Sequence, residues 1–128
     1  MQNSVTLLGR ILLAAIFIWS GIGKIAGYAG TEQYIESLGL AGGFLPLIIL
    51  WELGGGLALL LGLFTRPIAL ALAAFSVISA FLVHLHPGDQ MQMINFMKNV
   101  SMAGGFLFVA AYGAGGWSLD RKFKLIWA

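Results

Sequence analysis

Long apolar segments alternate with short polar ones along the whole chain. Residues 67–88 and 99–119 contain no Asp, Glu, Lys or Arg, and each is long enough for the helix of about 20 residues that crosses a bilayer. Residues 7–25 are equally apolar except for Arg10 and Lys24, whose long side chains can carry their charges to the two membrane surfaces. The pattern therefore predicts a membrane-spanning helix in each of these three segments.

A fourth apolar segment, residues 44–64, is interrupted by one acid, Glu52. Its many Leu and Ile residues can offset an acid that costs about 3 kcal/mol at the centre of a span. The polar connections between the segments are too short for a second domain, so we expect one all-α domain, an integral membrane four-helix bundle with antiparallel neighbours. The expected spans are about residues 7–25, 44–64, 67–86 and 96–113, with turn-like connections at 27–43, 65–67 and 86–90 and an amphipathic tail at 119–128.

Composition supports a membrane protein, because 59% of the residues are hydrophobic and 9% are charged, against about 25% charged in soluble domains. Twelve charged side chains cannot cover a water-soluble surface, and the basic residues form no stripe that could follow a nucleic acid. The chain has no cysteine, which excludes disulfides, thiol redox chemistry and thiolate metal sites. Any redox role therefore requires a bound ligand or a partner protein.

The basic residues are distributed unequally between the two ends of the predicted bundle. Lys24 and Lys98 lie toward one end, and five basic residues lie at the end that holds both termini, namely Arg10, Arg66, Arg121, Lys122 and Lys124. Since cytoplasmic loops carry the excess of Lys and Arg, we expect both termini in the cytoplasm. The basic and aromatic tail 119–128 is typical of a segment that lies on anionic lipid.

Glu52 is the candidate functional residue that stands out, because an acid within a span usually faces the bundle interior, where it is paired or protonated. Three readings remain open, namely a structural ion pair, a ligand or proton site, and a water-exposed position. Residues 54–56 are glycines, which would let a helix or a flat ligand approach. At about 1.5 Å per residue, Lys24, Lys98 and His84 all lie toward the half of the bundle remote from the termini. Either lysine can pair with Glu52 or extend to the membrane surface.

Other polar and aromatic residues of the same half are candidates for ligand contacts. His84 and Asn99 can hydrogen-bond a ligand, although His84 can equally face lipid headgroups. His84 and His86 are two residues apart, which places them on different helix faces and argues against a metal site. Trp19 and Trp51 can stack on a planar ring or belong to the aromatic belts of the membrane surfaces.

Several stretches follow one another in a characteristic order and spacing, namely residues 9–12 (GRIL), 17–24 (FIWSGIGK) and 51–63 (WELGGGLALLLGL), Thr65 with Arg66, His84, Lys98 with Asn99, and residues 115–120 (GGWSLD). In this order and spacing, the chain resembles the DoxX family of small four-span bacterial membrane proteins across nearly its whole length. This resemblance implies a bacterial inner-membrane location and an association with redox chemistry. Members of the family are linked to quinone-dependent oxidoreductases, to thiol and oxidative-stress complexes, and to resistance to quinones.

The resemblance implies site positions at Lys24, Glu52, His84, Lys98 and Asn99 but no catalytic mechanism. We therefore expect a polar pocket that binds a small, flat, quinone-like ligand and serves redox metabolism or detoxification. An activity, if the protein has one, would be that of a quinone-linked oxidoreductase subunit. Two alternatives remain, namely a non-enzymatic membrane subunit that docks an oxidoreductase, and a small proton-coupled transporter, which would need a homo-oligomer.

Overall fold

The computed structural model describes all 128 residues, and helices are its only regular secondary structure. Four helical segments are long and apolar enough to cross a membrane, as the hydrophobic pattern predicts. They are α1 (Gln2–Ala26), α3 (Leu45–Leu61) with the preceding 3₁₀ turn η1 (Gly42–Phe44), α4 (Thr65–Ser79) continued by the π-helical turn η2 (Ala80–His84), and α5 (Gln90–Tyr112). Two shorter helices are α2 (Tyr28–Ser37) and α6 (Leu119–Lys122).

Helix α1 begins at Gln2 rather than near residue 7, and two further features differ from those expected from hydropathy. The connection 27–43 was expected to be a turn-like segment, but it contains the polar helix α2. Helix α5 begins at Gln90 rather than near residue 96, because the Asp89 carboxylate accepts hydrogen bonds from the backbone N–H groups of Met91 and Gln92 and so caps the first turn. In both places polar residues form helix, which an apolar pattern does not reveal.

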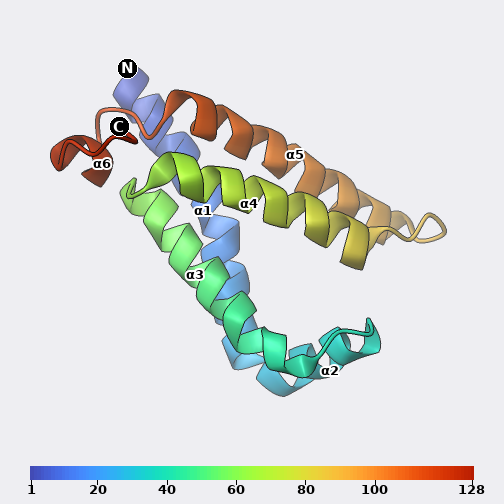
Figure 1. Ribbon diagram of the computed structural model, residues 1–128. Coiled ribbons are helices and arrows are strands. Elements are labelled where there is room, and N and C mark those ends of the chain that lie inside the picture. Colours follow the sequence, from blue (N-terminus) through green and yellow to red (C-terminus); the bar gives the residue numbers. More distant parts are fainter.

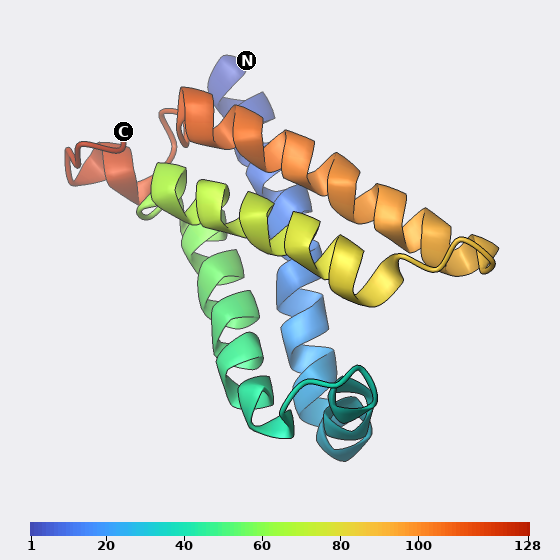
Figure 2. The ribbon, with the colours of Figure 1, turned by 45° about the vertical axis from the view of Figure 1, so that its right-hand side comes forward.

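The spans form two helix pairs. Helices α1 and α3 lie side by side as a first pair, and α4 and α5 lie side by side as a second pair (Figures 1 and 2). The pairs meet near the end that holds both termini and the α3–α4 turn, and they diverge toward the other end (Figure 2). Helix α2 lies at the diverging end of the first pair (Figures 1 and 2). The molecule is therefore a splayed four-helix arrangement with space between its two pairs.

Glycines allow the close contact between α1 and α3. A Cβ added to Gly56 would lie 3.0 Å from Ile18 Cγ1 and 3.4 Å from the Ala14 carbonyl oxygen, and one added to Gly21 would lie 2.6 Å from Leu53 Cγ. Larger residues would force the two helices apart. The glycines near Glu52 were expected to admit either a neighbouring helix or a flat ligand. At Gly56 the structure shows a neighbouring helix, α1.

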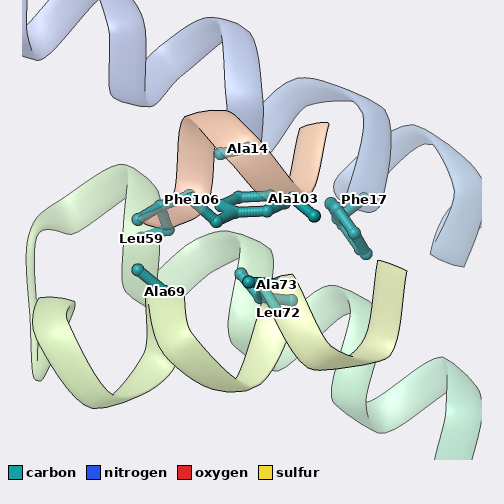
Figure 3. Packing of buried hydrophobic residues seen from close by; sticks show 8 residues of the cluster. All are labelled: Ala14, Phe17, Leu59, Ala69, Leu72, Ala73, Ala103 and Phe106. Atoms are coloured by element: carbon teal, nitrogen blue, oxygen red, sulfur yellow. The ribbon is translucent and has the colours of Figure 1, made fainter. Parts of the chain in front are cut away.

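The apolar core joins the two pairs where they meet. The cluster contains Ala14, Phe17, Leu59, Ala69, Leu72, Ala73, Ala103 and Phe106 (Figure 3). Phe17 of α1 contacts Phe106 of α5 edge to face, with ring centroids 5.5 Å apart. Small side chains such as Ala69 and Ala73 let α4 approach its neighbours closely. This core fixes one end of the splayed pairs and leaves the other end open.

Polar contacts from the C-terminal tail secure the same end. The buried Asp120 carboxylate accepts hydrogen bonds from the backbone N–H groups of Phe64 (2.7 Å) and Thr65 (2.9 Å), at the start of α4. Arg10, which is 1% exposed, donates to the carbonyl oxygens of Leu59 and Trp117. The expectation that the tail is mainly a lipid anchor is therefore incomplete, because Asp120 holds the α3–α4 turn.

The rest of the tail agrees better with that expectation. Phe123 and Ile126 are 60% and 84% exposed, as residues of an interfacial segment would be. Arg66 ties the tail to the bundle, since its guanidinium donates to the carbonyl oxygens of Trp127 in the tail and Ala111 near the end of α5.

Candidate ligand-binding cavity

A cavity of about 650 Å³ lies between the two helix pairs. Its walls come from α1, α2, α3, α4, η2 and α5, so it occupies the space that opens as the pairs diverge. Phe17 and Phe75 line its end toward the apolar core. Helix α2, which hydropathy did not predict, contributes Thr31 and Tyr34 to the wall. The cavity is therefore mostly apolar and lies within the spanning region of the protein.

The first helix pair contributes an ion pair to this cavity. Glu52 of α3 is 4% exposed, and its Oε1 lies 2.8 Å from Lys24 Nζ of α1. The same ammonium donates to Ser20 Oγ at 2.6 Å. Glu52 Oε1 accepts no other hydrogen bond, so the buried acid depends on Lys24 for its charge balance. Of the two lysines that could pair with Glu52, the structure selects Lys24.

The second helix pair contributes hydrogen-bonding groups from α5. Asn95, Lys98 and Asn99 all line the cavity, because residues three and four apart share one face of a helix. Ser76 of α4 adds a hydroxyl to the same wall, and this hydroxyl is buried without a hydrogen-bond partner. The lining therefore carries unused polar groups opposite the Lys24–Glu52 pair.

His84 lies in the π-helical turn η2 and also lines the cavity. Its Nδ1 lies 2.7 Å from Gln92 Oε1. An amide oxygen only accepts hydrogen bonds, so Nδ1 is the donor of this contact, and Nε2 has no partner of its own in the protein. His86 lies elsewhere, exposed and 3.1 Å from the Val83 carbonyl oxygen. The two histidines therefore do not form a pair.

Five of the seven candidate residues named from the sequence line this cavity: Lys24, Glu52, His84, Lys98 and Asn99. The two tryptophans do not. Trp19 is 80% exposed on the outer face of α1, and Trp51 packs against the apolar core. Asn95 and Ser76 are lining residues that sequence reasoning did not assign to the site. Asn95 lies three and four residues before Lys98 and Asn99, which places all three on one helix face. This signal was missed because α5 was expected to begin only near residue 96.

Comparison with known proteins identifies the family of the chain. Residues 5–85, well over half of the chain, match the DoxX family. The chain belongs to the DoxX family. No solved structure matches it.

Two relatives of this DoxX protein are inner membrane proteins of Escherichia coli. YqjF is 48% identical over 127 residues, which is 99% of this chain and 98% of YqjF. YphA is 41% identical over 123 residues, which is 91% of this chain and 88% of YphA. CatD of Bacillus subtilis, whose name assigns it provisionally as an oxidoreductase, is 36% identical over 77 residues, or 60% of this chain and 57% of CatD.

Several polar residues of the stretches that carry the family resemblance gather in two places in the structure. Arg10, Arg66 and residues 115–120 meet at the end that holds both termini, where they bind backbone groups. Lys24, Glu52, His84, Lys98 and Asn99 meet at the cavity. In this DoxX protein the first set secures the helix ends, and the second set lines the cavity between the two helix pairs.

Proposed function

We propose that this protein binds a small, flat, quinone-like molecule in the cavity between its helix pairs and serves redox metabolism or quinone detoxification in the bacterial inner membrane. The observation that carries this proposal is a largely apolar cavity at membrane depth with polar groups on both of its sides. The volume of about 650 Å³ falls within the range of about 300–1,000 Å³ that small-molecule sites occupy.

The chemistry of the lining suits both redox forms of a quinone. A quinone has an apolar ring with carbonyl acceptors at opposite edges, and the cavity offers donors from Lys24 on α1 and from Asn99 on α5. A quinol donates through its hydroxyl groups, and His84 Nε2 would accept such a hydrogen bond when the ring carries its single proton on Nδ1. The redox element of the proposal is supported by the similarity to CatD. Since the chain has no cysteine, its electrons would have to come from the ligand or from a partner.

Binding can be tested with the purified protein in lipid nanodiscs. We expect a copurified quinone in an organic extract analysed by mass spectrometry, and saturable binding of a short-chain ubiquinone in equilibrium dialysis. Leucine is similar in size to asparagine but forms no hydrogen bonds. Asn99→Leu should therefore weaken quinone binding by about tenfold. Trp19→Leu is the control, because Trp19 is 80% exposed and does not line this cavity.

Two results would count against the quinone site. Absence of both a copurified quinone and saturable binding would favour a subunit that docks an oxidoreductase. Equal weakening by Asn99→Leu and Trp19→Leu would place any binding outside the cavity.

We also propose that both termini lie in the cytoplasm, on the basis of the five-to-two distribution of basic residues. The chain has no native cysteine, so single cysteines can be introduced at Gln90 and Ala128, which are exposed at opposite ends. In intact cells, an impermeant maleimide should label Gln90→Cys and leave Ala128→Cys unlabelled until the membrane is permeabilised. The reverse labelling pattern would invert the topology.

A further inference from the structure

The charges that line the cavity do not balance. Two lysines, Lys24 and Lys98, and one acid, Glu52, belong to the lining. Lys24 and Glu52 neutralise each other at 2.8 Å, and no acid lies within ion-pair distance of Lys98. The cavity therefore carries one uncompensated positive charge, on α5.

Lys98 is placed where a ligand could use that charge. It is the ninth residue of α5, and its side chain is exposed and forms no side-chain hydrogen bond. Asn95 and Asn99 lie on the same face of α5. On the adjacent helix α4, Ser76 is 1% exposed, and its Oγ has no hydrogen-bond partner. These residues offer an ammonium, two amides and a hydroxyl as donors to one region of the cavity.

Lys98 lies on a membrane-spanning helix without an acidic partner, so a bound anion would balance its charge. The Lys24–Glu52 pair on the other wall has no net charge, and Glu52 would repel an anion that approached it closely. An anionic group should therefore bind on the α5 side. A neutral carbonyl at the opposite edge of the same ring would then face Lys24.

From this asymmetry, and resting on the proposed quinone-like ligand, we infer that the cavity selects flat ligands in their anionic form. The ligand class is that of hydroxyquinones and other acidic phenol-like rings, with the ionised oxygen at Lys98 and the rest of the ring in the apolar part of the cavity. Proton loss takes place before binding, so the inference involves no covalent or electron-transfer step.

Lawsone and its O-methyl ether provide a matched pair of probes. Lawsone is a hydroxynaphthoquinone that is an anion at neutral pH, and its ether has nearly the same size and shape but no charge. We expect lawsone to bind about tenfold or more tightly than the ether, as a charge-assisted hydrogen bond allows. The measurement is equilibrium dialysis against protein in phosphatidylcholine nanodiscs at one fixed pH, with uptake by empty nanodiscs subtracted.

Variants assign the preference to one residue. Lys98→Met keeps an unbranched side chain that is one atom shorter and has no charge, so it should abolish the preference for lawsone, whereas Lys98→Arg should retain it. Lys122→Met is the matched control, because Lys122 lies in α6 at the end that holds the termini. Thermal unfolding of each variant shows whether it is folded. If a variant does not fold, the comparison of lawsone with its ether on the unmodified protein still tests the preference for the anion.

Each outcome decides between the two proposals. A preference for lawsone that is lost in Lys98→Met alone supports the inference. Equal affinity for the two probes on the unmodified protein overturns it and leaves quinone binding intact. A preference for lawsone that persists in Lys98→Met overturns the role of Lys98. If neither lawsone nor its ether binds, the proposed function is overturned as well.

Discussion

Replacing Glu52 with leucine is expected to destabilise the protein unless Lys24 is replaced at the same time. Loss of one member of a buried ion pair leaves an uncompensated charge and costs roughly 3–5 kcal/mol in a fully buried setting. The Lys24 side chain is 26% exposed and that of Glu52 is 5% exposed. We therefore expect a loss near the lower limit of that range, about 3 kcal/mol.

The double variant Lys24→Met with Glu52→Leu is the test of that explanation. An apolar pair of similar volume often matches a buried ion pair in stability, so the double variant should recover most of the loss. Unfolding in detergent, followed by circular dichroism, measures each free energy of unfolding and the coupling between the two residues. Additive losses in the double variant would show that the pair does not stabilise the fold.

The variant Glu52→Gln separates the structural role of Glu52 from a role in binding. Glutamine keeps the shape and most hydrogen bonds of the acid but leaves Lys24 without its counter-charge. A structural pair predicts lower stability in Glu52→Gln, whereas a ligand or proton role predicts a stable protein with weakened quinone binding. Normal stability together with normal quinone affinity in Glu52→Gln and Glu52→Leu would contradict both roles.

Replacing Asp120 with alanine is expected to cost about 3 kcal/mol, since two hydrogen bonds to a charged acceptor contribute about 1.5 kcal/mol each. The variant removes the acceptor of the Phe64 and Thr65 N–H groups at the start of α4. These donors lie in a turn where Phe64 has a positive φ of 49°. Loss of the carboxylate should therefore loosen the α3–α4 turn and remove one of the links between this turn and the tail.

Asp89→Ala is the matched control for Asp120→Ala. Asp89 also accepts two backbone N–H groups at a helix start, but its cap is exposed and local, so the loss should be about 1 kcal/mol. Thermal unfolding in the same detergent compares the two variants. Equal losses would show that Asp120 acts as an ordinary helix cap rather than as a link between the tail and the α3–α4 turn.

Some features of this protein follow from the sequence because the membrane leaves few choices. Backbone polar groups have no water to bind in the bilayer interior, so a long apolar segment has to form a helix. That constraint made the four spans predictable, and the cost of a buried charge identified Glu52 as a residue that needs a partner. Lys24, His84, Lys98 and Asn99 were named as polar residues at a similar depth, and the family resemblance implies the same positions.

Other features depend on the rotation and tilt of the helices, which hydropathy does not encode. Lys24 and Lys98 lie at similar depths, and only the close packing of α1 on α3 at Gly21 and Gly56 selects Lys24 as the partner of Glu52. Trp19 lies in the same apolar segment as Lys24 but faces outward, because a few residues along a helix change the face.

Contacts between distant segments were decided by the tertiary structure alone. The Asp120 carboxylate accepts hydrogen bonds from the backbone N–H groups of Phe64 and Thr65, which lie 56 and 55 positions earlier in the chain. No local sequence pattern predicts a contact over that distance. The cavity likewise exists because two helix pairs meet at one end and diverge at the other, which depends on the shapes of the side chains in their shared core. The sequence by itself determined which segments enter the membrane and which polar residues they carry. Packing determined which of those residues face one another, because side-chain shape sets helix rotation and hydrophobicity does not.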